Sequence, residues 1–181
     1  MRIHITGASG SGATTLGHAL SRTLSSRHLD SDHYYWLPTQ PPYRQKRLPF
    51  ERLNLLKADI QAQENVVVSG SLVGWGEEIE NAFDLIVFLY LPASIRLARL
   101  SQREISLYGA VDPAFLTWAS QYDEGTAEGR SLARHNAWLA QRLCPVLRLE
   151  KDLSVAERIA NVIGAISHIT KQKTAIDGSF I

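Results

Sequence analysis

The sequence predicts an α/β fold in which a parallel sheet is covered by helices on both faces. Three observations predict it: a short β-prone segment ends in a glycine-rich loop, two fully apolar runs follow later, and helical patterns separate these segments. The chain has 181 residues, the size of one domain. Because strands and helices alternate, the crossovers between strands are expected to be right-handed.

The first part of the chain predicts a strand, a loop and a helix in that order. Arg2 to Thr6 is β-prone, and Thr14 to Ser25 has leucines at helical spacing. A second short strand is expected at His28 to Asp32. The prolines between residues 33 and 42 exclude regular structure there, and a helix is expected over about 50–63.

The second part of the chain contains the apolar runs. Val66 to Val68 and Leu85 to Leu91 are typical of strands buried in a parallel sheet. Pro92 stops the second run before a helix over 93–104. Glycines then separate two further helices, and a helical lid is predicted at roughly 104–130.

The chain closes with a strand and a helix. Pro145 to Leu149 predicts the last strand, and Ser154 with Glu157 three residues later is a capping-box signature before an amphipathic run to about Ile169. One domain over residues 1–170 is therefore expected, followed by a loose tail at 171–181.

Composition narrows the class of partner and compartment. Lys and Arg number 19 against 18 Asp and Glu, so the formal net charge of +1 gives no field for nucleic acid or an anionic membrane. The single cysteine excludes an internal disulfide and a cysteine-rich zinc site. No apolar run is long enough for a signal or membrane segment, so a cytoplasmic protein is expected.

The glycine-rich loop has the spacing G-x-x-x-x-G-x-[ST] between a strand and a helix. In such loops glycines let backbone N–H groups surround phosphate oxygens, and the helix adds its positive end. The dinucleotide fingerprint fits worse, since it would require glycine at Thr15. A plain glycine-rich turn is the other interpretation. The nucleotide-binding residues predicted here are Gly7, Ala8, Ser9, Gly10, Ser11, Gly12, Ala13, Thr14 and Thr15.

Ala13 stands where this motif ordinarily has lysine. The lysine reaches the β- and γ-phosphates, and losing one such donor costs on the order of 3 kcal/mol in the transition state. A cation from elsewhere could replace it, with the arginines after Pro92 as candidates and Lys46 as a weaker one. Thr14 is expected to ligate Mg²⁺ through its hydroxyl.

The chain resembles the adenylate-kinase-like and shikimate-kinase-like P-loop kinases. The resemblance spans nearly the whole chain through the glycine loop, His28 to Asp32, Val66 to Ser71, Asp84 to Leu89 and the arginine-bearing helix after Pro92. It implies a three-layer sandwich with a five-stranded parallel sheet in the order 2-3-1-4-5. It also implies a phosphate-donor site at the loop and a mobile lid bearing arginines.

Asp30 and Asp32 are the predicted acceptor-side carboxylates. If the chain is extended there, residues two apart point to one side at the carboxyl end of a strand. One could orient or deprotonate the acceptor hydroxyl while the other, Asp32, holds the metal together with Thr14. A solvated strand end with an Asx turn is the alternative.

Two arginine stripes could neutralise the transferred phosphoryl group. Arg96, Arg99 and Arg103 fall at i, i+3 and i+7, and Arg130, Arg134 and Trp138 at i, i+4 and i+8. Arginine holds phosphate by bidentate forks. By the resemblance, Arg99 and Arg103 are the preferred catalytic candidates. A solvated basic face is the alternative for each stripe.

Aromatic residues and histidines complete the candidate set. Tyr34, Tyr35, Trp36 and Trp75 are expected on loops at the carboxyl end of the sheet, where they either stack on a base or sugar or pack the lid against the core. His4 interrupts the first strand and is interpreted as a structural histidine, and His135 is given no role.

The function expected from these patterns is an ATP-dependent kinase that uses Mg²⁺ and transfers the γ-phosphoryl group to a small metabolite or nucleotide. Asp30, Asp32, Arg99 and Arg103 are its predicted catalytic residues, and Thr14 and Asp32 its metal ligands. Because of Ala13, a nucleotide-binding regulator without catalysis and a slow NTPase stay open as alternatives. Neither nucleic acid nor a membrane is an expected partner.

Overall fold

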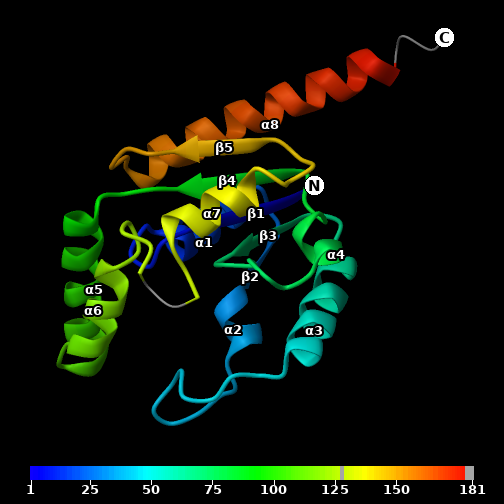
Figure 1. The fold of residues 1–181 in the computed structure, drawn as a ribbon. Helices are drawn as coiled ribbons and strands as arrows, with labels where there is room; N and C mark the ends of the chain where they lie inside the picture. The colour runs from blue at the N-terminus through cyan, green and yellow to red at the C-terminus, as the bar shows by residue number, and fades with distance from the viewer. Residues whose placement is uncertain (127–128, 178–181) are drawn as a thin grey trace.

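The computed structural model describes residues 1–126 and 129–177 (Figure 1). Strands alternate with helices as expected. The element order is β1 (Arg2–Gly7), α1 (Ala13–Thr23), β2 (Arg27–Asp30), α2 (Ser31–Tyr35), α3 (Pro49–Gln61), β3 (Val66–Ser69), α4 (Glu77–Glu80), β4 (Leu85–Leu89), α5 (Ala93–Tyr108), α6 (Pro113–Ser120), α7 (Leu132–Leu139), β5 (Val146–Leu149) and α8 (Val155–Asp177).

The five strands form one parallel sheet in the order β2-β3-β1-β4-β5, which confirms the predicted architecture. In register, Ile5 of β1 lies beside Ser69 of β3 and Val87 of β4. All carboxyl ends therefore meet at one edge, on the side of Figure 1 where α5 and α6 lie. A ligand site in an open parallel sheet is expected at this edge.

The two faces of the sheet are buried under different helices. Side chains alternate along each strand, so Ile3 and Ile5 face α1 and α8, whereas Val66 and Val68 face α3, α4 and α7. Leu16 and Leu20 of α1 lie in the first core and Leu56 and Ile60 of α3 in the second. Both faces of β3 and β4 are buried, which explains why these strands are continuous apolar runs.

Two expectations about element boundaries are wrong. The chain is not extended through Asp32, because the Asp30 side chain accepts a hydrogen bond from the Asp32 N–H and starts the short helix α2, which also includes residues 33–35 of the expected loop. The C-terminal helix continues to Asp177 instead of ending near Ile169, so 171–177 are not a loose tail. Residues 178–181 of the expected tail lie outside the described residues.

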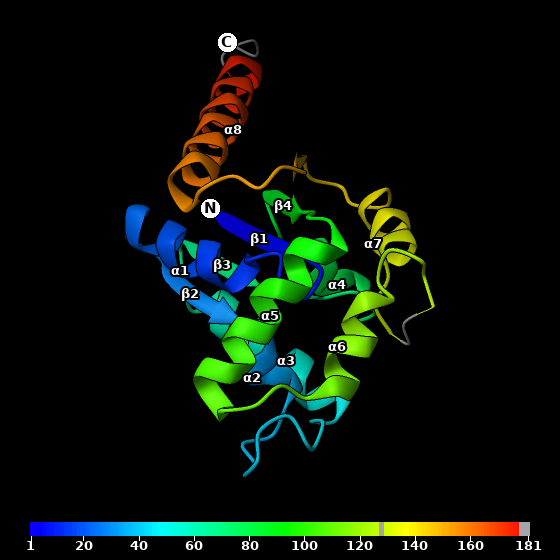
Figure 2. The same ribbon diagram turned by 90° about the vertical axis from the view of Figure 1, so that its left-hand side faces the viewer.

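The predicted lid region consists of the end of α5, the helix α6 and the segment that leads to α7. Seen from the carboxyl edge of the sheet, α5 lies in front and α6 packs beside it (Figure 2). Asp112 caps α6 by accepting hydrogen bonds from the backbone N–H groups of Ala114 and Phe115. Of the helices in the described ranges, none is long and apolar enough to cross a membrane.

Candidate functional site

The glycine loop between β1 and α1 has a backbone that only glycine tolerates. Gly10 and Gly12 have φ values of 82° and 93°, in the region that disfavours side chains. A Cβ at Gly10 would lie 2.6 Å from the Arg96 carbonyl oxygen, and one at Gly7 would clash with the Leu89 carbonyl. The loop is thus held close to β4 and α5, with its shape fixed by its neighbours.

The start of α1 offers unsatisfied donors to an anion. Gly12 is its N-cap, no side chain caps the helix, and its first turn contains no acidic residue. Inside the loop, the Ser11 hydroxyl is buried without a hydrogen-bond partner among the described residues. Backbone N–H groups and a helix N-terminus are the groups that hold phosphate oxygens in P-loops. The loop therefore fits the polyphosphate of a nucleotide.

The structure pairs the loop with Asp30 and not with Asp32. The Thr14 hydroxyl donates to Asp30 Oδ2 at 2.9 Å, and Asp30 Oδ1 accepts from the Asp32 N–H at 3.0 Å. Asp30 thus links the first turn of α1 to the start of α2. Of the two acidic residues, Asp30 is the one beside the expected metal ligand Thr14.

Asp32 follows Asp30 by two residues and lies in the first turn of α2. Burial raises the pKa of its carboxyl above the ordinary value, and the positive charges of Arg130 and Arg103 oppose that rise. The charges of two arginines, one beyond α6 and one in the second half of α5, therefore favour the ionised form of this carboxyl. A carboxylate with a raised pKa beside cations is an arrangement suited to accepting a proton from a hydroxyl.

The arginine stripe on α5 has three different environments. Arg96 is fully buried, and its guanidinium donates to two carbonyl oxygens and to Asp123, so it is unavailable to a phosphate. Arg99 pairs with Asp152 at 2.5 Å in the loop before α8. Arg103 pairs with Glu104, and its guanidinium lies over the Phe115 ring. Of this stripe, only Arg103 has a charge that acts on the pKa of Asp32.

The three residues of the second stripe, Arg130, Arg134 and Trp138, also have different environments. Trp138 is a core residue whose Nε1 donates to the buried Glu80 carboxylate at 2.7 Å, and Arg134 is exposed. Arg130 precedes α7 and is the arginine whose charge acts most strongly on Asp32. The helical spacing that grouped these three residues does not apply, because Arg130 lies before the helix begins.

Aromatic residues at this edge hold an arginine that the sequence patterns did not reveal. The Arg52 guanidinium of α3 lies 4.6 Å from the Tyr35 ring and 4.7 Å from the Trp75 ring, each measured to the centroid. The Arg52 guanidinium makes no hydrogen bond or ion pair within the described part of the chain. Arg52 stands alone in a helix pattern, so only the folded chain shows that it lies against Tyr35 at the end of α2 and Trp75 in the loop after β3.

His4 and His135 are buried and neutral. His4 Nε2 bonds with the Gly70 carbonyl oxygen at 2.8 Å, and burial lowers its pKa to about 4, which agrees with a structural role. Burial also lowers the pKa of His135 to about 3. Its Nδ1 lies 2.6 Å from the Tyr122 hydroxyl and its Nε2 lies 3.5 Å from Ser71 Oγ. His135 therefore joins the end of the lid to the loop after β3.

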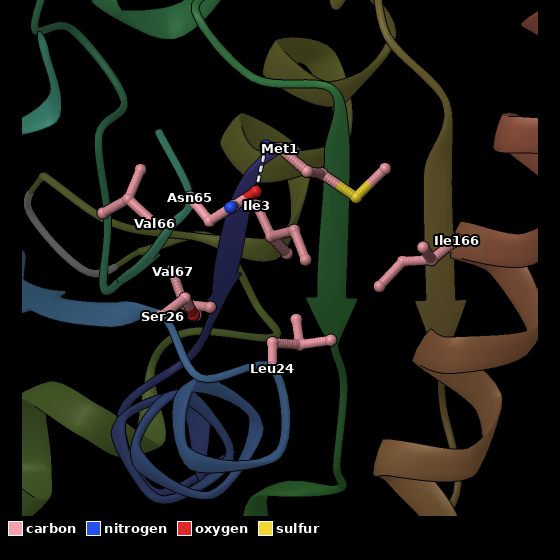
Figure 3. Close-up of a pocket in the computed structure, with 8 residues that line it drawn as sticks. All are labelled: Met1, Ile3, Leu24, Ser26, Asn65, Val66, Val67 and Ile166. Atoms are coloured by element: carbon pink, nitrogen blue, oxygen red, sulfur yellow. Dashed lines mark hydrogen bonds between the residues drawn. The ribbon is translucent and has the colours of Figure 1, made fainter. Parts of the chain in front are cut away.

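A hollow at the opposite end of the sheet is not part of this site. Its volume is about 260 Å³, and its lining residues come from the amino ends of β1 and β3, from the turn between α1 and β2, and from α8 (Figure 3). Figure 3 shows Met1 bonded to Asn65 across its rim. The glycine loop contributes none of the lining side chains. This hollow has no charged side chain in its wall.

Metal binding at this edge would need few protein ligands. Within residues 1–126 and 129–177, no three His, Cys, Asp or Glu side chains form a metal-binding cluster. Mg²⁺ at phosphate sites usually takes one or two protein oxygens and keeps phosphate oxygens and water for the rest. The Thr14 hydroxyl and the Asp30 carboxylate, already in contact, fit that donor set.

Sequence comparison finds a family and two relatives. The model of the AAA_18 family, an AAA domain, matches residues 3–109. The uncharacterized protein YqaC of Bacillus subtilis (strain 168) is 45% identical over 175 residues, covering 91% of this chain and 97% of that protein. A cytidylate kinase of Thermoplasma acidophilum is 29% identical over 119 residues, covering 58% of this chain and 61% of the kinase.

Structural comparison places the fold among small-molecule kinases. The structure of a shikimate kinase from Acinetobacter baumannii in complex with shikimate superposes with a TM-score of 0.59 at 17% identity. The match covers 92% of this chain and 93% of the kinase. At that identity the likeness concerns the fold, a P-loop kinase-like sheet with its helices.

Proposed function

Because the chain belongs to the AAA_18 family of AAA domains and has a P-loop kinase-like fold, we propose that it is an ATP-dependent kinase of a small metabolite or nucleotide. The observation on which the proposal rests is a single edge of the sheet with two parts. One is a glycine loop built for phosphate, and the other is the pair of acidic residues beside it, with Asp30 bonded to the Thr14 hydroxyl and to the Asp32 N–H. The positive charges of Arg130 and Arg103 act on the Asp32 carboxylate.

The donor side consists of the loop from Gly7 to Thr15. Its backbone N–H groups and the start of α1 would hold the phosphates of ATP. The Thr14 hydroxyl and Asp30 would hold Mg²⁺, directly or through water, in place of the expected pair Thr14 and Asp32. When bound, Mg²⁺ neutralises charge on the β- and γ-phosphates.

The transfer itself joins an acceptor oxygen to the γ-phosphorus while the bond between that phosphorus and the β–γ bridging oxygen breaks, so that ADP leaves. The proton of the acceptor hydroxyl goes to the Asp32 carboxylate. Arg103 and Arg130, whose charges act on Asp32, would stabilise negative charge on the phosphoryl group during transfer. Arg99 is assigned no direct part, because Asp152 occupies its guanidinium.

The acceptor side favours a molecule with an anionic group as well as a hydroxyl. The Arg52 guanidinium lies against both the Tyr35 and the Trp75 rings and leaves its N–H groups for a ligand. A carboxylate or phosphate oxygen pair matches that planar fork. The aromatic faces can at the same time contact an apolar part of the acceptor.

The experiment is to measure ADP formation with a panel of nucleosides, nucleotides and small hydroxylated acids. The proposal expects at least one anionic acceptor to accelerate ADP formation, with a phosphorylated product of matching amount. Asp32→Asn should abolish that acceleration. The matched control Asp59→Asn changes an exposed carboxylate of α3 that accepts a hydrogen bond from the Tyr34 hydroxyl, and it should retain the acceleration. Phosphate release that no acceptor accelerates would support a slow NTPase instead.

A further inference from the structure

A buried arginine of the C-terminal helix reaches the glycine loop. Arg158 on α8 is 4% exposed, and its Nη1 donates to the Ser11 carbonyl oxygen at 2.9 Å. The two residues are 147 positions apart in the sequence. Figure 1 shows α8 running along the sheet above β5, with its first turns at the end where the loop lies.

The Arg158 guanidinium lies against Gly12, the N-cap of α1. A Cβ added at Gly12 would lie 2.9 Å from Arg158 Nη1, and no other atom would come within 4 Å of it. Gly12 immediately precedes Ala13, the position of the usual lysine in this motif. The positive charge of Arg158 is thus placed beside the start of α1, where the helix dipole already favours an anion.

This buried charge has no carboxylate partner within the ranges that the structure describes. The nearby acid, Asp152, is paired with Arg99, and the Arg158 Nε is buried without a hydrogen-bond partner. Burial lowers the pKa of Arg158, and Arg99 lowers it further. Because an uncompensated buried cation is costly, a complementary anion is expected next to it.

We propose that Arg158 supplies from α8 the fixed positive charge that Ala13 cannot supply, and that the anion it complements is the polyphosphate of the bound nucleotide. The inference rests on the proposed function. Arg158 is a positioning residue: it holds the loop through the Ser11 carbonyl and makes the loop electropositive. The arginines of α5 were the sequence-based candidates for this task. Arg96, Arg99 and Arg103 are each paired with a carboxylate of the protein.

The test compares charge with mere packing at position 158. Arg158→Met removes the charge and keeps much of the apolar stem, whereas Arg158→Lys keeps the charge. Arg22→Met, at the exposed far end of α1, removes one charge of the same sign outside the site. Calorimetric dissociation constants are measured for Mg²⁺ with adenylyl-imidodiphosphate, and melting temperatures are measured with and without inorganic pyrophosphate.

Arg158→Met should weaken binding of the ATP analogue by about tenfold or more, while Arg158→Lys and Arg22→Met stay within about threefold. Adding Ala13→Lys to Arg158→Met should restore most of the affinity, because the new ammonium reaches the same phosphates. Binding by Arg158→Met equal to the parent would overturn the inference. The inference would also be overturned if Arg158→Lys bound the ATP analogue as weakly as Arg158→Met and Ala13→Lys restored no affinity. In that case the shape of the arginine side chain would matter and its charge would not.

The pyrophosphate measurement separates this inference from the proposed function. If the parent ignores the ATP analogue but pyrophosphate raises its melting temperature and Arg158→Met loses that rise, the nucleotide function fails and the Arg158 anion site stands. If the parent binds the analogue and Arg158→Met binds equally well, the function stands and the inference is overturned. If pyrophosphate stabilises the parent and Arg158→Met equally, the inference is likewise overturned.

Discussion

Replacing Arg96 by methionine should destabilise the protein far more than the same change at Arg99, three residues farther along α5. The Arg96 guanidinium is fully buried and donates to the Leu91 and Ala119 carbonyl oxygens at 2.9 and 3.2 Å. It also pairs with Asp123 at 3.0 Å and lies 5.0 Å from the Tyr122 ring centroid. These contacts connect α5 to α6 and to the segment after it.

The size of the effect follows from these partners. Removing one member of a buried ion pair costs about 3–5 kcal/mol. That range includes the loss of the two hydrogen bonds to carbonyl oxygens, which costs about 1 kcal/mol each. For a chain of this length, about 2–4 °C of melting temperature corresponds to each kcal/mol, so a fall of about 6–20 °C is expected.

Urea and thermal unfolding of Arg96→Met and Arg99→Met measure the difference. Arg99 is 41% exposed and pairs with a half-exposed Asp152, so its loss should change the free energy of unfolding by less than about 1 kcal/mol. Equal small losses for both variants would refute the assignment of Arg96 as the link between α5 and α6. They would also reopen the interpretation of the whole stripe as a phosphate-binding face.

The remaining predictions concern catalysis, acid stability and the metal. Asp32→Asn should lower acceptor-dependent turnover by about a hundredfold or more and leave the dissociation constant of the ATP analogue within about threefold. A loss of turnover of about fivefold or less would contradict its role as proton acceptor. The pKa values of His4 and His135 are depressed to about 4 and about 3, so below about pH 6.5 the unfolded chain binds protons that the folded chain does not. Their contribution to the free energy of unfolding should therefore be complete above about pH 7. Urea titrations should show the free energy of unfolding falling by about 2 kcal/mol per histidine between pH 7 and 5, and a flat profile would contradict their burial as neutral groups. Asp30→Asn should weaken analogue binding more with Mg²⁺ than without it, and an equal loss in both conditions would exclude Asp30 from metal binding.

The fold was predictable because its signals are local. Val66 to Val68 and Leu85 to Leu89 are apolar on both faces, which is the pattern of buried parallel strands, and each run became a strand of the sheet. Glycine spacing likewise located the loop between β1 and α1. These features depend on neighbours in the sequence, so a pattern can report them.

Parts of the candidate site were not predictable, because they depend on contacts between distant residues. Asp30 became a helix cap instead of the first of two parallel carboxylates, a choice that the Thr14 contact and the α2 turn make together. The stripe of Arg96, Arg99 and Arg103 has the right spacing for one face, yet each guanidinium found a different partner.

Arg52 and Arg158 show the same limit more strongly. Neither residue belongs to a charge pattern in the sequence. Arg52 acquires its position from α2 and the loop after β3, which bring the Tyr35 and Trp75 rings against its guanidinium. Arg158 acquires its position from the packing of α8 against α1, which brings it to Ser11. Residues whose role arises from tertiary contacts are visible only in the folded chain.

The most direct test of the account is a residue-specific measurement of where the nucleotide binds. Backbone amide resonances of the ¹⁵N-labelled protein are followed while Mg²⁺ and adenylyl-imidodiphosphate are added to millimolar concentration. The account predicts that the largest shifts occur at the amides from Gly10 to Thr15, with smaller shifts at Asp30 and Arg158. Unchanged loop amides at millimolar ligand, or shifts confined to another surface, would contradict it.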